Sequence, residues 1–364
     1  MSSLFAPISF RSLELANRIV VSPMCQYSAD DGTANDWHVV NLGHFALSGP
    51  GLVFTEAAHV SSEGRITPRC LGLYSDENEA ALERVVSFVH RWTKSATGIQ
   101  LAHAGRKAST LPPWEGGGRY DGPGSWQPVA PSSIAYADGW HVPRALDAVG
   151  MQKVRDDFVN AAHRSERIGF DVIELHFAHG YLAHEFLSPL SNARTDEYGG
   201  SLANRMRFPL ELFAAVRAVW PAHKPLGVRI SASDYVEGGW SLDDSVAFAR
   251  ELRTLGCDFI DCSGGGLSNQ QRIETGPGYQ VPFAQAIREK SGVPTIAVGM
   301  ITDPDQAEAI VAGGQADLVC LARAMIRDPN WTWDAADALD GSAFVPNQYG
   351  RGRNAATGRI LASR

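Results

Sequence analysis

The residues with the clearest capacity for chemistry are two histidines and a tyrosine that fall within six positions, His176, His179 and Tyr181. They follow the apolar run 170–173, which is typical of a buried strand. A strand that only packs needs apolar side chains, whereas imidazole and phenol groups just past its end can donate hydrogen bonds and transfer protons. The cluster therefore indicates a metal site, an acid–base group or a clamp for a carbonyl oxygen.

The elements that would position this cluster are short strands that alternate with amphipathic helices along the chain. The strands are rich in Val, Ile and Leu, as strands covered on both faces must be. We expect strands at 19–24, 51–57, 98–104, 170–178, 225–231, 259–264, 294–300 and 317–323. We expect helices at 78–92, 151–168, 202–220, 242–255, 281–290 and 304–312.

Residues at the ends of these helices support the assignment. Their starts carry capping residues or a first-turn proline, and their ends carry glycines that can adopt the left-handed cap. The starts are marked by Ser75, Ser241 and Asp303 with Pro304, and the ends by Gly169, Gly256 and Gly292.

Eight strands, each followed by a helix, predict an α/β fold of the (β/α)8 TIM barrel type, which closes in about 250 residues plus insertions. We expect a single domain over 1–352 and a flexible tail over 353–364, which is rich in Ala, Gly, Ser and Arg. The largest insertion, 105–145, follows the third strand and should shape the active-site face as a long loop. A doubly wound sheet would need a glycine fingerprint after the first strand, and 22–25 is not one.

Composition narrows the possible partners. The 364 residues are 44% hydrophobic and carry a formal net charge of −8, which argues against a nucleic-acid or anionic-membrane surface. The N-terminus lacks the pattern of a signal peptide, and no apolar stretch approaches the ~18 residues of a membrane span. We therefore expect a cytoplasmic protein.

The cysteines predict reduced thiols. There are five, an odd number, and they are far apart with no CxxC pair. This pattern fits neither a disulfide framework nor a zinc or iron–sulfur module. Four are expected in the core, whereas Cys25 directly follows the first strand and is a candidate functional residue.

The last three strands predict a phosphate site. In barrels of this kind the functional residues lie where strands end. Ser263, Gly299 and Arg323 occupy the ends of the sixth, seventh and eighth strands. Backbone N–H groups of such glycine-containing loops and a guanidinium bind phosphate well, so a phosphate-bearing cofactor is expected.

Five segments, in order, resemble the old yellow enzyme family of flavin-dependent ene-reductases, and specifically its thermophilic-like branch. They are SPMCQY at 22–27, GIQLAHAGRK at 98–107, ELH at 174–176, HGY at 179–181, and RTDEYGGS at 194–201 with Asn204 and Arg205. The resemblance runs from Leu4 to about Gly352.

This resemblance implies FMN at the barrel mouth, reduced by NADPH or NADH. Cys25 would lie near flavin N5, Gln100 would bind the pyrimidine edge, and Arg229 would face the N1/C2 oxygen. The implied cofactor-binding residues are Ser22, Pro23, Met24, Cys25, Ala57, Gln100, Arg229, Ser263, Gly299, Ala322 and Arg323. The family commonly has Gly-Arg at 322–323, so Ala322 would be strained if that position required a positive φ.

The resemblance also implies catalytic roles for the cluster and for the residues near it. His176 and His179 would donate hydrogen bonds to the carbonyl or nitro oxygen of an unsaturated substrate, and Tyr181 would protonate its α-carbon. Tyr27 would close the pocket. Arg351 would reach into a neighbouring subunit's active site, which implies a homodimer or homotetramer.

Several alternatives stay open at this stage. His176 and His179 could bind a metal ion together with Glu174 or Glu56, although we predict that the protein has no metal site. They could also be core residues whose hydrogen bonds are satisfied within the protein. A dienoyl-CoA reductase barrel is a related enzyme, but its chains continue into an iron–sulfur domain. A flavin-binding protein without turnover is the non-enzymatic alternative. We expect a structural role for four other histidines, His38, His44, His103 and His184.

Overall fold

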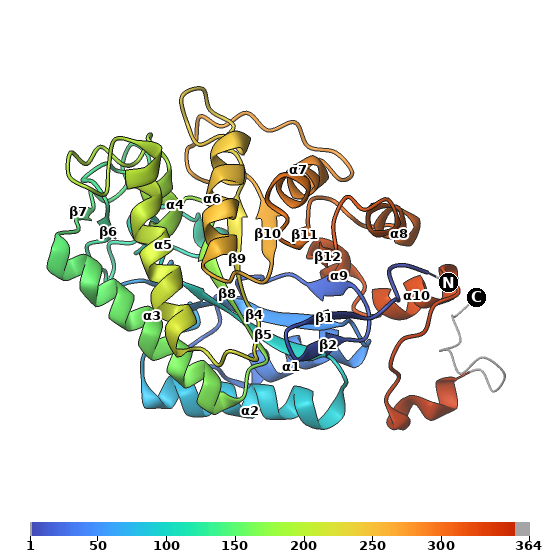
Figure 1. Cartoon of the computed structure of the whole chain (residues 1–364). Helices are drawn as coiled ribbons and strands as arrows, with labels where there is room; N and C mark the ends of the chain where they lie inside the picture. The colour runs from blue at the N-terminus through green and yellow to red at the C-terminus, as the bar shows by residue number, and fades with distance from the viewer. Residues whose placement is uncertain (1, 354–364) are drawn as a thin grey trace.

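The computed structural model describes residues 2–353, and eight parallel strands in it form a closed barrel surrounded by helices (Figure 1). In order around the barrel the strands are β3 (Ile19–Val21), β4 (Leu52–His59), β5 (Ala96–Ala102), β8 (Val172–Phe177), β9 (Leu226–Ser231), β10 (Ile260–Ser263), β11 (Thr295–Ala297) and β12 (Leu318–Leu321). The prediction of a single-domain (β/α)8 barrel is confirmed.

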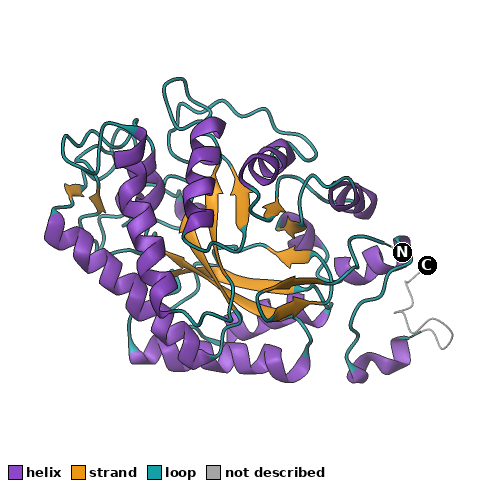
Figure 2. Cartoon of the chain, viewed as in Figure 1, coloured by secondary structure: helices purple, strands orange, loops and turns teal. Residues whose placement is uncertain are grey.

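The helices lie outside the strands (Figure 2). They are α1 (Asp36–Leu47), α2 (Asp76–Trp92), α3 (Ala148–Ile168), α4 (Leu182–Leu187), α5 (Leu202–Val219), α6 (Leu242–Thr254), α7 (Val281–Ser291), α8 (Pro304–Ala312), α9 (Arg323–Arg327) and α10 (Trp331–Ala338). The predicted caps are present: Ser75, Ser241 and Asp303 accept first-turn backbone N–H groups. Gly169, Gly256 and Gly292 have positive φ at the helix ends.

The elements differ from the expected ones at several places, of which one strand end and one helix are described first. The expected strand at 317–323 ends at Leu321, and Arg323 begins α9 instead. The helix α1 was not predicted, because its sequence mixes β-branched residues and histidines with Gly43. A Cβ on Gly43 would lie 2.5 Å from the ring of Phe88 on α2, so the glycine allows these two helices to pack.

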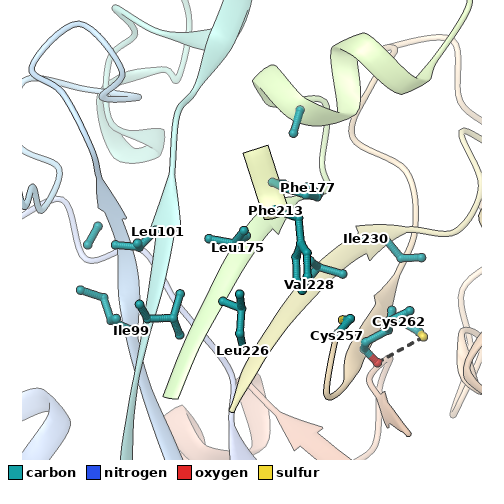
Figure 3. Packing of buried hydrophobic residues seen from close by; sticks show 14 of the residues in the cluster. Ile99, Leu101, Leu175, Phe177, Phe213, Leu226, Val228, Ile230, Cys257 and Cys262 are labelled. Carbon is teal, nitrogen blue, oxygen red and sulfur yellow. Dashed lines mark hydrogen bonds between the residues drawn. The ribbon is translucent and has the colours of Figure 1, made fainter. Parts of the chain in front are cut away.

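Alternation along each strand separates an apolar outer face from a mixed interior. Leu175 and Phe177 of β8 pack outward with Phe213 of α5, as do Val228 and Ile230 of β9 (Figure 3). The alternate residues of the same strands therefore face the barrel interior. These inward residues are Glu174 and His176 on β8, Arg229 on β9, Gln100 on β5, and Asp261 and Ser263 on β10.

An apolar cluster fills the bottom of the barrel. It combines inward residues near the starts of the strands with the N-terminal hairpin β1 (Ile8–Phe10) and β2 (Leu13–Leu15), whose Phe10 ring lies 5.9 Å from that of Phe259. A Cβ on Gly227 would meet the Phe259 ring at 2.4 Å, so the absence of a side chain leaves room for the ring. The hairpin closes this end, and polar groups are concentrated toward the other end.

The insertion 105–145 is ordered and lies on the barrel's mouth side. It contains the short helices η1 (Gly105–Lys107) and η2 (Pro113–Glu115) and the paired strands β6 (Val129–Ala130) and β7 (Arg144–Ala145). Trp126 fixes it to the loop after β4, because its indole N–H donates to the Glu63 carbonyl at 2.8 Å. Within residues 2–353 no helix has both the length and the apolar character needed to cross a membrane.

Candidate active site

The structure places the three rings of the original cluster together at the end of β8. The centroid of His176 lies 5.1 Å from that of His179 and 5.0 Å from that of Tyr181, in edge-to-face geometry. His176 is the last inward residue of the strand, and Tyr181 is the residue that precedes the first turn of α4. The short turn 178–180 therefore brings two imidazoles and a phenol to one side of the barrel mouth.

Backbone conformation and hydrogen bonds fix this turn. His179 has a φ of +57° and Gly180 a φ of +70°. The N–H of His179 donates to the hydroxyl of Ser231 at 2.8 Å, and the ammonium of Lys107 donates to the His179 carbonyl at 2.9 Å. The sequence analysis did not assign Ser231 or Lys107, although Lys107 belongs to the GIQLAHAGRK segment.

A second support for the turn comes from His184, for which a structural role is expected from the sequence. Its Nδ1 accepts the N–H of Gly180 at 2.9 Å, and its Nε2 lies 2.9 Å from the carboxylate of Asp234. Both side chains are fully buried. The histidine thus ties the turn to the loop after β9, and Asp234 orients the ring.

Burial sets the protonation of the cluster. Desolvation is the main reason why the pKa values of His176 and His179 are well below the ordinary 6.5. Both imidazoles are therefore neutral at physiological pH, with one N–H each. The N–H of Ala178 points at Nδ1 of His176 at 3.4 Å, which leaves the proton of that ring on Nε2. Nε2 of His179 lies 2.7 Å from the hydroxyl of Ser263.

Tyr181 keeps its proton for the same reason. Burial, followed by the nearby Cys25, raises the pKa of Tyr181 well above 10. The ammonium of Lys107 lies 5.1 Å from the centre of the ring. A neutral phenol beside a cation can donate a proton, because the cation stabilises the phenolate that is left.

Cys25 and Tyr27 belong to the same apolar cluster as Tyr181. The cluster also contains Trp126 of the insertion. Cys25 is half-buried, whereas the other four cysteines are buried, and desolvation raises the pKa of its thiol well above 9. Tyr27 has a φ of +50°, and its ring meets the edge of Trp114 at 5.6 Å. The insertion thus contributes two tryptophans that composition alone did not assign to the site.

The segment that carries Cys25 is attached to the buried pair Glu56 and His38. The carboxylate of Glu56 accepts the N–H of Gln26 at 2.9 Å, and its other oxygen lies 3.2 Å from Nε2 of His38. Nδ1 of His38 accepts the N–H of Asn35 at 3.0 Å, so the ring proton is on Nε2. Glu56 and His38 therefore position the loop after β3.

Part of the predicted cofactor set lines one cavity of about 700 Å³. The five residues that line it are Arg229, Ser263, Gly299, Ala322 and Arg323. Gly299 has a φ of +122°. Ala322 has a φ of −112°, so the backbone strain considered for an alanine at this position does not arise.

Of the other predicted cofactor residues, Ser22 contacts the lining of this cavity through Arg229. The hydroxyl of Ser22 accepts a hydrogen bond from the guanidinium of Arg229 at 2.9 Å, and Pro23 and Met24 continue the same segment. Ala57 and Gln100 lie opposite each other in the β4–β5 pair.

This set of groups fits FMN. The cavity has the volume of a small-molecule site. Its lining includes the guanidinium of Arg229, which suits a pyrimidine edge, and the exposed guanidinium of Arg323 with the loop at Gly299, which suit a phosphate. The amide of Gln100, which also suits a pyrimidine edge, lies on β5 and donates to Glu174.

Arg351 and the predicted C-terminal tail do not line this cavity. Arg351 lies in the short helix η3 (Asn347–Gly352), where Tyr349 packs 6.0 Å from Trp333 of α10 and shares a groove with α1. This segment therefore lies against the outer helices of its own chain. The predicted tail 353–364 falls outside the described residues except for Arg353.

The part of the chain that the structure describes shows no arrangement of side chains that would support a metal site. No group of three or more His, Cys, Asp or Glu side chains there is arranged to hold an ion. Glu56 and Glu174, the carboxylates considered for this role, contact Gln26 and Gln100 instead.

Comparison with known proteins identifies the family. Residues 3–340 match the NADH:flavin oxidoreductase / NADH oxidase family. The chain is 44% identical to the NADPH dehydrogenases of Geobacillus thermodenitrificans (strain NG80-2) and Bacillus subtilis (strain 168), over 96% of this chain and 98% of each of those proteins. It also resembles morphinone reductase, with a TM-score of 0.77 and 27% identity over 100% of this chain and 94% of that one. The predicted kinship with old yellow enzymes is confirmed: the chain belongs to the NADH:flavin oxidoreductase / NADH oxidase family and is an NAD(P)H-dependent flavin oxidoreductase.

Proposed function

We propose that the protein is an FMN-dependent ene-reductase that reduces the C=C bond of α,β-unsaturated carbonyl or nitro compounds. The observation that carries this proposal is the convergence of His176, His179 and Tyr181 at the barrel mouth, with neutral imidazoles and a protonated phenol. Such a group can hold an oxygen and deliver a proton, which are the two tasks that remain once a hydride donor is present.

When bound, FMN would supply the redox chemistry, since it accepts a hydride from NADPH or NADH and donates a hydride to the alkene. The use of a nicotinamide is supported by the NADPH dehydrogenases to which the chain is similar. It is also supported by the structure of morphinone reductase in complex with tetrahydroNAD, which resembles this chain with a TM-score of 0.74. Gln100 would hold the pyrimidine edge, and Arg229 would stabilise the negative charge that reduction places near N1 and the C2 oxygen.

The imidazoles would bind the substrate oxygen. An N–H from each of His176 and His179 can donate to a carbonyl or nitro group, which withdraws electron density from the β-carbon. As the hydride adds there, negative charge collects on the oxygen, and the two N–H groups stabilise it without reorientation. Because both rings are neutral, they donate hydrogen bonds without releasing a proton.

Tyr181 would complete the reduction. Its phenol would transfer a proton to the α-carbon, and the resulting phenolate would regain a proton from water. Lys107, above the ring, would stabilise the phenolate in the interval. Cys25, Tyr27 and Trp114 would form the apolar side of the pocket, and we propose that Arg351 completes it in a homodimer or homotetramer.

The test is a flavin assay on the purified protein. We expect a yellow protein that releases close to one FMN per chain, bleaches with NADPH under anaerobic conditions, and regains its colour when an enone is added. A colourless protein that takes up no FMN would overturn the proposal. If the protein bleaches but is not reoxidised by enones or nitroalkenes, the proposed flavin cofactor would stand and the proposed substrate class would be refuted.

A further inference from the structure

A layer of charged side chains lies inside the barrel, between the apolar floor and the mouth. It consists of Gln100 on β5, Glu174 on β8, Arg229 on β9 and Asp261 on β10, which are neighbouring strands. Glu174 and Asp261 are completely buried, and Arg229 is 6% exposed. Burying ionisable groups is costly, so their presence here needs an explanation.

The contacts within this layer are specific. The amide nitrogen of Gln100 donates to Oε1 of Glu174 at 2.7 Å. Arg229 contacts Asp261 and Ser22: its Nε is 3.4 Å from the Asp261 carboxyl, and its Nη1 donates to the Ser22 hydroxyl. Oε2 of Glu174 makes no hydrogen bond to any described residue. The carboxyl therefore contacts the flavin-binding glutamine on one side and has an unused oxygen on the other.

The layer holds two carboxyl groups and one guanidinium, so one carboxylate is enough to neutralise it. Asp261 is the partner in direct contact with Arg229. Burial, with the negative charge of Asp261, raises the pKa of Glu174 to about 8, although Arg229 and Gln100 oppose this. Glu174 is therefore largely protonated at neutral pH and loses its proton in mildly alkaline solution.

Three other groups near Glu174 keep their charge state in this range. Burial keeps the pKa of His176, two positions along the strand, well below 6.5, and raises that of the Cys320 thiol on β12 well above 9. The pKa of Arg229 is raised by Asp261 against the effect of burial. Burial also raises the pKa of Asp261, and Arg229 opposes this.

We propose that Glu174 is a positioning residue for the flavin: its carboxyl fixes the amide of Gln100, and its ionisation sets the net charge below the flavin ring. Because Oε1 of Glu174 accepts from the amide nitrogen, the carbonyl oxygen of Gln100 is left to accept the flavin N3–H. When the carboxyl ionises, an uncompensated negative charge lies beside Arg229 and opposes the charge that reduction adds. The inference rests on the proposed binding of flavin at Arg229 and Gln100.

The experiment measures the two-electron midpoint potential of the flavin-loaded protein from pH 6 to 9.5 in wild type, Glu174→Gln and Glu185→Gln. Glu185 is the matched control, since it is also fully buried with a pKa raised to about 8 but lies on α4 and contacts Arg106. We expect wild type and E174Q to agree near pH 6. At pH 9.5 the wild-type potential should be lower by at least about 30 mV, which is a tenfold change in the equilibrium constant. E185Q should behave as wild type does.

A second variant tests the positioning of Gln100. E174Q retains an oxygen that can accept from Gln100, so its flavin dissociation constant should stay within threefold of the wild-type value. Glu174→Leu removes the acceptor and should weaken flavin binding by about tenfold or more. Equal binding by both variants would refute the positioning role.

The outcomes separate the two hypotheses. If the flavin binds and is reduced but the potentials of wild type and E174Q stay parallel across the range, the inference is wrong and the proposed function stands. The wild-type protein alone should show the extra fall in potential above about pH 8, so poor folding of a variant does not remove the test. A protein that binds no flavin would refute the proposed function itself.

Discussion

At the scale of single residues, burial decides what the site can do. The same desolvation lowers the pKa of His176 and His179 and raises that of Tyr181. None of the three side chains carries a charge at neutral pH. The two imidazoles therefore act as hydrogen-bond donors, and the phenol of Tyr181 retains its proton. The roles that we propose for these residues follow from these protonation states.

Changing Tyr181 to Phe should separate the two halves of the reaction. Reduction of the flavin by NADPH needs no proton from the phenol and should change less than threefold. Reoxidation by an enone should slow by about a hundredfold or more, because general acid catalysis contributes at least that much. Anaerobic stopped-flow absorbance measures both steps, and the opposite pattern would refute the proton-donor role.

Removing both imidazoles should affect ligand binding far more than flavin binding. Phenolates bind such donor pairs, and each hydrogen bond to a charged oxygen contributes about 1.5–3 kcal/mol. His176→Ala with His179→Ala should therefore weaken phenolate binding at least about a hundredfold, as measured by the charge-transfer absorbance of the complex. The FMN dissociation constant should change less than fivefold.

His44→Ala is the control for this experiment, since His44 is exposed on α1. It should change neither constant. Equal loss of phenolate and FMN in the double variant would show that the imidazoles hold the fold instead.

Residue types and order in the sequence were sufficient to predict that the three rings lie together at a strand end, but not which groups hold them. His176, His179 and Tyr181 are close in sequence, so a strand end brings them together. Their supports come from other strands and loops, such as Asp234 behind His184 and Lys107 from the insertion. Only the closed barrel makes these pairs adjacent.

At the scale of elements, the turn between β8 and α4 determines the geometry of the site. It contains two consecutive residues with positive φ, His179 and Gly180. A Cβ on Gly180 would lie 2.3 Å from the carbonyl oxygen of Gly266 and 2.7 Å from Cα of Leu267. Since both are backbone atoms, the turn cannot accept a side chain there without moving.

Gly180→Ala should therefore destabilise the protein by at least about 3 kcal/mol, measured by urea unfolding. The matched control is Gly200→Ala, where φ is +79° but no atom lies within 4 Å of the added carbon. That variant should lose only about 1–2 kcal/mol, from backbone strain alone. Similar losses in both would show that the close approach to Gly266 contributes little.

Element prediction from the sequence succeeded where the periodicity was strong. Helices α5 and α8 begin at the predicted first residue and end within one residue of the predicted last residue. Strands were predicted too long, as at 294–300 against Thr295–Ala297, because residues past the barrel rim continue the apolar run without pairing. The position of the insertion was predicted but its conformation could not be, since it is held by tertiary contacts such as that of Trp126 with Glu63.

At the scale of the whole molecule, the barrel buries acids that stay protonated far above their ordinary range. Burial raises the pKa of Glu185 to about 8, with Arg106 and Lys107 opposing it. The unfolded chain releases this proton near pH 4.5, whereas the folded protein retains it until about pH 8. Stability is therefore lost as the pH rises between these values.

This linkage predicts a declining free energy of unfolding from pH 6.5 to 8. At about 1.4 kcal/mol per pH unit, Glu185 alone should account for about 2 kcal/mol over that interval. The buried histidines His59 and His103, whose pKa values burial lowers to about 3, titrate below this range. Urea unfolding of wild type and E185Q at several pH values measures the slope, which should be shallower in the variant. An identical slope would contradict the assignment.

The central claim is that two imidazoles and a phenol direct a hydride to a carbon–carbon double bond. The most direct measurement is an anaerobic single turnover, in which protein reduced with one equivalent of NADPH is mixed with a cyclic enone and the products are separated. We predict one saturated ketone per flavin, with no allylic alcohol. Formation of the allylic alcohol, in which the carbonyl is reduced and the alkene is intact, would contradict the account.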